Sequence, residues 1–75
     1  MSNEPNGLYL RILLRQQGTG FYLQASGAWT TVRQSARNFA DCVMAISFAK
    51  QARLRGADVL MAGPDQTYDV VLARV

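Results

Sequence analysis

The feature that most constrains the fold is an alternation of side chains that ends at a glycine-rich turn. Residues 8–16 carry apolar side chains at every second position, which is the period of a half-buried strand. A two-residue type II′ turn is expected at Gly18-Thr19, because that turn has glycine first. The apolar segment 21–25 then forms the returning strand. The sequence therefore predicts a β-hairpin near the N-terminus.

This turn fixes which residues of the two strands face each other. On one side of the hairpin, Arg15 is expected opposite Tyr22. A polar connection is expected to follow at Thr30–Gln34. On the other side of the hairpin we expect three apolar pairs, which are Leu14 with Leu23, Ile12 with Ala25, and Leu8 with Trp29.

One helix is expected in the middle of the chain, and two residues compete for its N-cap. Ser35 would start it at Ala36, whereas Asp41 would leave residues 36–39 as a short extended or 3₁₀ segment before the helix. We favour Asp41. Gly56 is the expected residue just after the helix. The apolar stripe contains Cys42, Ala45, Ile46, Ala49 and Ala52, widened by Val43 and Phe48.

A second hairpin is expected at the C-terminal end. Asp58–Ala62 and Thr67–Val75 are its strands, joined by a turn at residues 63–66 with proline in its second position. Its pairing places five side chains on one face, namely Val59, Met61, Tyr68, Val70 and Leu72.

These elements predict an α+β domain of the type ββαββ. We expect a four-stranded antiparallel sheet in the order 2-1-3-4, with the helix packed on one face. The chain of 75 residues is the size of one domain. Residues 1–7 are polar and predict a flexible leader, so the domain covers residues 8–75.

Residues that carry catalytic or metal chemistry are scarce. The chain has no histidine and one cysteine, Cys42, which we interpret as a core thiol. This excludes Ser–His and Cys–His nucleophile pairs and the usual zinc ligand sets. The segment Gly18-Thr19-Gly20 lacks the lysine of a phosphate-binding loop. We therefore expect a protein that is not an enzyme, with no catalytic residue, no metal and no cofactor.

The second face of the predicted sheet has no helix to cover it, and several of its side chains are apolar. A face exposed to water would be more polar. We therefore predict a protein-interaction domain that forms a homodimer or binds another protein through this face or an edge strand. The expected interaction residues are Leu13, Leu60, Val71, Ala73 and Val75.

The alternative function is binding of single-stranded RNA or DNA by the first hairpin. Tyr9 and Tyr22 would stack on bases, and Arg11 and Arg15 would contact phosphates. A purely structural interpretation of the same residues is cation–π packing of Arg15 on Tyr22. Arg33 and Arg37, in or near the connection before the helix, could extend a basic surface or be solvated, and we favour solvation.

No stretch has the ~18 apolar residues of a membrane span. The segment 1–7 lacks the features of a signal peptide, and one cysteine cannot form an internal disulfide. We therefore expect a cytoplasmic protein without membrane contact.

Several short motifs resemble those of small bacterial single-domain proteins without an assigned function. The resemblance spans nearly the whole chain, and it implies a bacterial, single-domain protein but no activity, cofactor or site residue. Its motifs are Leu8-Tyr9-Leu10, Gly20-Phe21-Tyr22-Leu23-Gln24, Trp29-Thr30, Ala36-Arg37-Asn38-Phe39 and Tyr68-Asp69-Val70-Val71-Leu72.

Overall fold

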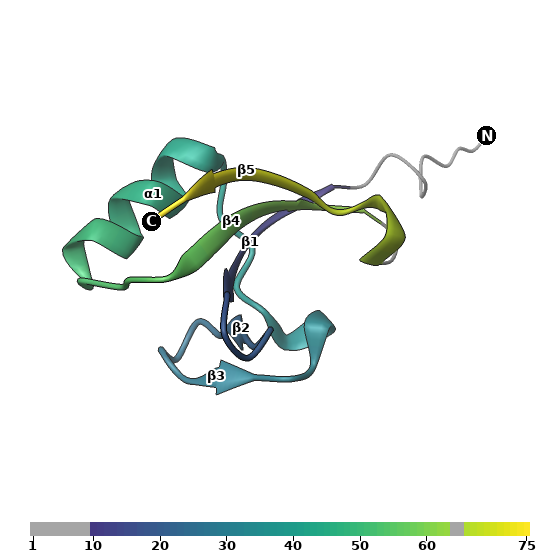
Figure 1. The fold of residues 1–75 in the computed structure, drawn as a ribbon, viewed down its shortest axis with the longest axis horizontal. Coiled ribbons are helices and arrows are strands. Elements are labelled where there is room, and N and C mark those ends of the chain that lie inside the picture. Colours follow the sequence, from purple (N-terminus) through teal and green to yellow (C-terminus); the bar gives the residue numbers. More distant parts are fainter. Residues whose placement is uncertain (1–9, 64–65) are drawn as a thin grey trace.

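The apolar segments of the chain form one antiparallel sheet in the order β3-β2-β1-β4-β5 and one α-helix (Figure 1). This computed structural model describes residues 10–63 and 66–75. The predicted order of four strands is confirmed, but a fifth strand extends it. The elements are β1 (Arg11–Gln16), β2 (Tyr22–Leu23), β3 (Trp29–Thr30), the 3₁₀ turn η2 (Arg33–Ser35), α1 (Cys42–Gln51), β4 (Ala57–Ala62), the 3₁₀ turn η3 (Gln66–Tyr68) and β5 (Val70–Arg74).

β1 pairs only briefly with β2 before the two strands separate. Arg15 lies opposite Tyr22, as predicted. The predicted pairing of Ile12 with Ala25 is wrong, because Ile12 instead forms a bridge with Phe39, close to the start of the helix. The leader predicted at residues 1–7 and the pair that involves Leu8 lie outside the described residues. The first hairpin therefore departs from a simple meander, because the segment before the helix takes part in the pairing.

The turn of this hairpin differs from the predicted type II′ turn. The positive φ of 76° belongs to Gly20, and Gly18 has no such angle. The N–H of Gly20 donates to the carbonyl oxygen of Gln16 at 2.8 Å, and five residues, 17–21, lie between β1 and β2. The register survives because the N–H of Gln16 still donates to the carbonyl oxygen of Phe21 at 2.7 Å.

Strand β3 lies where the sequence predicted the start of a polar connection. Leu23 of β2 faces Trp29, and Tyr22 faces Thr30. The loop between them closes with Gly27, whose φ is 94°. A strand of two residues contains too few alternating positions to be recognised from periodicity. The four-strand prediction was wrong for this reason.

The Asp41 cap of α1 is confirmed. Its side-chain oxygen accepts the N–H of Met44 at 2.8 Å, which satisfies one of the free donors of the first turn. The alternative start at Ser35 is wrong, because Ser35 ends η2. Ala36 and Phe39 each form a β-bridge, so the segment before the helix is extended.

The end of α1 differs from the prediction that Gly56 follows it directly. The residue in the left-handed region is Arg53, with a φ of 57°. The N–H of Arg53 donates to the carbonyl of Lys50, and that of Leu54 to the carbonyl of Ala49. These two bonds form a Schellman motif, in which glycine is the usual central residue. The helix therefore ends three residues earlier than Gly56 indicated.

The second hairpin is confirmed in its first strand and shortened in its second. β4 adds one residue to the predicted strand Asp58–Ala62. β5 begins at Val70 instead of Thr67, because Tyr68 belongs to η3. Two residues of the predicted turn, 64 and 65, lie outside the described residues.

A β-bulge changes which face the end of β5 presents. Val59 pairs with Ala73 and Leu60 pairs with Val71, so Leu72 is the extra residue. The predicted common face of Val59 and Leu72 is therefore wrong. Beyond the bulge, Ala73 takes the helix side of the sheet, where the unbroken alternation had placed Leu72.

Side chains are buried on both faces of the sheet, so the predicted bare face is wrong. On the second face, the β2–β3 hairpin and the segment after it fold beneath β1 and β4 (Figure 1). The buried face of α1 is also narrower than the predicted apolar stripe, because Val43 is 70% exposed and Ala52 is exposed. Cys42 is half-buried against the helix-side core. The helix-side core contains Leu14, Leu23, Phe39, Ala45, Ala49 and Val59, and the second core contains Leu13, Tyr22, Ala36, Leu60 and Ala62.

Candidate functional site

The predicted interaction residues are distributed over three environments. Leu13 and Leu60 are 0% exposed in the second core, so a partner cannot contact them in the folded chain. Ala73 and Val75 pack against the helix-side core, because of the bulge in β5. Val71 alone of the five is on the surface, with 40% of its area exposed.

Tyr22, the described one of the two tyrosines predicted to bind nucleic acid, is buried inside the protein. Tyr22 is 2% exposed, which leaves no ring face for a base. Its hydroxyl oxygen lies 3.3 Å from a guanidinium nitrogen of Arg33 and 3.3 Å from the amide nitrogen of Gln66. Tyr9 lies outside the described residues. The guanidinium that faces the Tyr22 ring is that of Arg33, 5.9 Å from the centroid.

The two arginines of that face are engaged within the chain. Arg11 donates to the carbonyl oxygen of Ala36 at 2.6 Å and to that of Arg33 at 3.2 Å. Arg15 forms an ion pair with the buried Asp58 at 3.6 Å. These contacts explain why arginine occurs on the second face of the sheet, because each one satisfies carbonyls or a carboxylate that burial removes from water.

A charge pair that sequence reasoning missed joins the two halves of the chain. Arg33 of η2 holds both carboxylate oxygens of Asp69, at 2.6 and 2.5 Å. Only 16% of the Arg33 side chain and 7% of the Asp69 side chain are exposed. The prediction that Arg33 is solvated is therefore wrong. No local pattern signals this pair, since 36 residues separate its members.

Two further hydrogen bonds fix this pair to the end of β4. Arg33 donates to the carbonyl oxygen of Gly63 at 3.1 Å, and the N–H of Gly63 donates to Asp69 at 3.2 Å. The hydrogen bond from its side chain to Asp69 raises the pKa of Arg33 above its usual range, although burial acts in the opposite direction. Arg33 therefore stays charged, and the pair sets where the chain enters β5.

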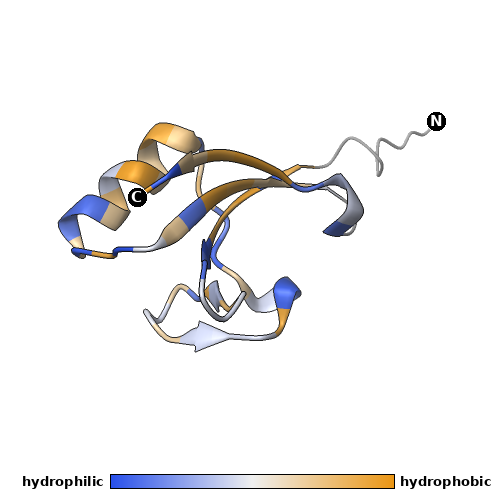
Figure 2. Cartoon of the chain, in the orientation of Figure 1, coloured by the Kyte–Doolittle hydropathy of each residue, from blue (hydrophilic) through white to orange (hydrophobic). Residues whose placement is uncertain are grey.

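An accessible apolar surface that fits an interaction site lies on β5. Three consecutive side chains of this strand are exposed: Val70 by 47%, Val71 by 40% and Leu72 by 40%. β5 is the last strand of the sheet order, so one of its edges has no neighbour among the described strands. Figure 2 shows hydrophobic residues along most of this strand. We call this surface the β5 edge.

The backbone of the β5 edge has hydrogen-bonding groups that β4 does not use. Val75 exchanges both backbone hydrogen bonds with Ala57. In an antiparallel ladder such pairs alternate with pairs that are not hydrogen-bonded. The N–H and C=O of Arg74 therefore point away from β4, toward the position of a further strand.

Within residues 10–63 and 66–75, no group of three or more His, Cys, Asp or Glu side chains is arranged to hold a metal ion. No helix of that part of the chain has the length and apolar character needed to cross a membrane. No known protein family, curated protein or solved structure matches this chain.

Proposed function

We propose that this chain is a non-catalytic protein-interaction domain that self-associates through the β5 edge. The observation that carries the proposal is the run of three exposed apolar side chains on an edge strand. An open edge of this kind pairs readily with another strand, and proteins that stay monomeric usually interrupt it with charge or proline. The exposed segment Val70–Leu72 contains neither.

A strand is the occupant that satisfies both features of the β5 edge. Its outward backbone groups need partners in the plane of the sheet, and its apolar side chains need cover above and below that plane. An added strand supplies the first, and its own side chains supply the second. A helix laid across the edge would leave the backbone groups of Arg74 without partners.

The sequence of β5 is compatible with pairing to a second copy of itself. An antiparallel pair centred on Leu72 places each Arg74 opposite a valine, and the two arginines stay apart. Val71 then lies opposite an alanine. The pairing is symmetric, as expected for a homodimer, and it joins two five-stranded sheets into one.

The free thiol of Cys42 supports placing this domain in a reducing compartment, the cytoplasm.

The test is the mass in solution, measured by size-exclusion chromatography with light scattering over a tenfold range of concentration. We expect the mass of two chains for the wild type and of one chain for Val71→Asp. The matched control is Val43→Asp, which places the same charge on an exposed valine of the helix, 70% exposed. A monomeric wild type, or a Val43→Asp variant that dissociates while Val71→Asp does not, overturns the proposal.

A further inference from the structure

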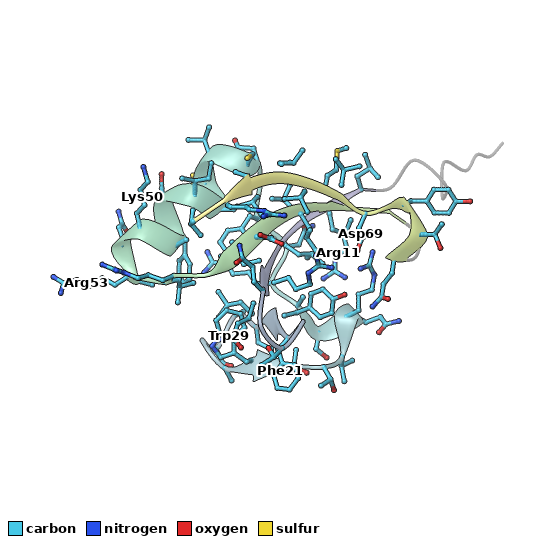
Figure 3. The ribbon with its side chains drawn as sticks, viewed as in Figure 1. Arg11, Phe21, Trp29, Lys50, Arg53 and Asp69 are labelled. Atoms are coloured by element: carbon cyan, nitrogen blue, oxygen red, sulfur yellow. The ribbon has the colours of Figure 1, made fainter. Side chains whose placement is uncertain are left out.

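Three cations are exposed together where α1 ends. Lys50 belongs to the last turn of the helix, and Arg53 and Arg55 follow in the loop before β4. Lys50 and Arg53 point away from the sheet at this end of the molecule (Figure 3). None of the three forms an ion pair with a described residue. The ion pairs among the described residues involve Arg15, Arg33 and Arg74 instead. We call these three residues the basic end.

The described carboxylates do not neutralise the basic end. Asp58 is 4% exposed and is bound by Gln17, Arg15 and Arg74. Asp69 is held by Arg33 in the interior. Asp41 caps the opposite end of the helix. These described acids are therefore used internally or lie at the other end of α1, and none of them forms an ion pair with the basic end.

The backbone of Arg53 gives a second reason to assign a role to its side chain. A left-handed conformation is unfavourable for a non-glycine residue, and glycine is the usual residue at this place of a Schellman motif. Non-glycine residues in such conformations cluster at active sites and ligand-binding sites. The guanidinium of Arg53 has no partner among the described residues that would account for this backbone conformation.

Arg37 adds an oriented cation beside the same helix. Its guanidinium lies over the rings of Phe39 and Phe48, at 4.6 and 4.9 Å from the centroids. The prediction that Arg37 is simply solvated is therefore wrong. Stacking on two rings restricts the side chain while its N–H donors remain free for an anion.

We infer that the basic end, together with Arg37, binds the phosphate backbone of a nucleic-acid duplex. Three of the four cations are arginines, whose forked donors suit phosphate oxygens. The exposed neighbours Ser47, Gln51 and Gly56 are not large apolar residues of the kind that a membrane-binding surface inserts into lipid. The described aromatic rings beside these cations, Phe39 and Phe48, are buried and half-buried, so stacking on single-stranded bases is not favoured over backbone contact.

The inference does not depend on self-association, and it predicts binding without sequence preference. Each phosphate contact makes the slope of log association constant against log salt concentration more negative by about 0.9. Four contacts therefore give a slope of roughly −3.6. At 50 mM salt each contact is worth about tenfold in affinity by the same relation.

Fluorescence anisotropy with a labelled 20-base-pair DNA duplex tests this, over a series of salt concentrations. Arg53→Gly is expected to weaken binding about tenfold and to lower the magnitude of the slope by about 0.9. Because glycine suits a φ of 57°, this variant is also expected to unfold at a higher urea concentration. Loss of binding then cannot be attributed to loss of the fold. Lys50→Gln and Arg55→Gln test the same charge loss at other backbone positions.

Val43→Glu is the charge-matched control, since it lowers the net charge by one at the other end of α1. It is expected to change the affinity by less than about threefold, as a distant screened charge does. If Val43→Glu and Arg53→Gly weaken DNA binding equally, the effect comes from the net charge alone, and the inference is overturned. Absence of duplex binding at low salt also overturns it, and so does binding only to vesicles that contain phosphatidylserine.

Discussion

Replacing Arg33 by methionine is expected to destabilise the fold more than removing any of the exposed arginines. The change keeps an unbranched side chain of similar reach but removes the charge and its donors. Among the described residues, the N–H of Gly63 is then the donor that still binds the Asp69 carboxylate, whose side chain is 7% exposed. A carboxylate left without its cation in such a site pays the cost of lost hydration with little compensation.

The magnitude follows from the burial of the pair. Breaking a buried ion pair by removing one partner costs about 3–5 kcal/mol, whereas an exposed pair is worth about 0–1 kcal/mol. The two side chains are 16% and 7% exposed, so we expect about 3 kcal/mol. A domain of this length has a stability of about 4–11 kcal/mol, from roughly 0.05–0.15 kcal/mol per residue. The variant is therefore expected to fold, with roughly a quarter to three quarters of its stability lost.

Urea denaturation measures this cost, with the fluorescence of Trp29, the one tryptophan of the chain, as the probe. The double variant Arg33→Met with Asp69→Leu is the control, because it replaces both charges by apolar groups. It should lose no more than about 3 kcal/mol, well below the sum of the two single losses, because neither charge is then buried alone. A loss below about 1 kcal/mol for Arg33→Met, or additive losses in the double variant, would refute the reasoning.

Two further substitutions test the helix start and the second core. Asp41→Ala should cost about 1 kcal/mol in urea denaturation, because the N–H of Met44 loses its acceptor; Asp41→Asn keeps an oxygen there and should cost less than half as much. Leu60→Ala should cost about 2–5 kcal/mol, and Val71→Ala on the opposing strand less than about 1 kcal/mol, because Leu60 is 0% exposed and Val71 is 40% exposed. Equal costs at Leu60 and Val71 would contradict a core on both faces of the sheet.

Local chemistry made most of the fold predictable. The Asp41 cap, strand β4 and the pairing of Arg15 with Tyr22 each rest on residues that lie close together in the sequence or across one turn. The strand order followed from two hairpins and one crossover helix, because short connections favour neighbouring strands.

Contacts between distant segments were not predictable in the same way. The bridge of Ile12 with Phe39 and the pair of Arg33 with Asp69 join residues 27 and 36 positions apart (39 − 12 and 69 − 33). Periodicity carries no information about such contacts. No pattern in the sequence indicates the bulge at Leu72, which moves the following residues of β5 to the other face.

The error about the bare face had a signal in the sequence, and that signal supports the proposed site. A strand covered on both faces is continuously apolar, whereas a half-exposed strand alternates. β4 contains the unbroken run Val59–Ala62, and it is covered on both faces by the chain itself. β5 contains the comparable run Val70–Ala73, yet its first three residues stay 40–47% exposed. Because the described part of the chain supplies cover for β4 and not for the start of β5, the same argument that corrects the first prediction supports the proposal that a second molecule covers β5.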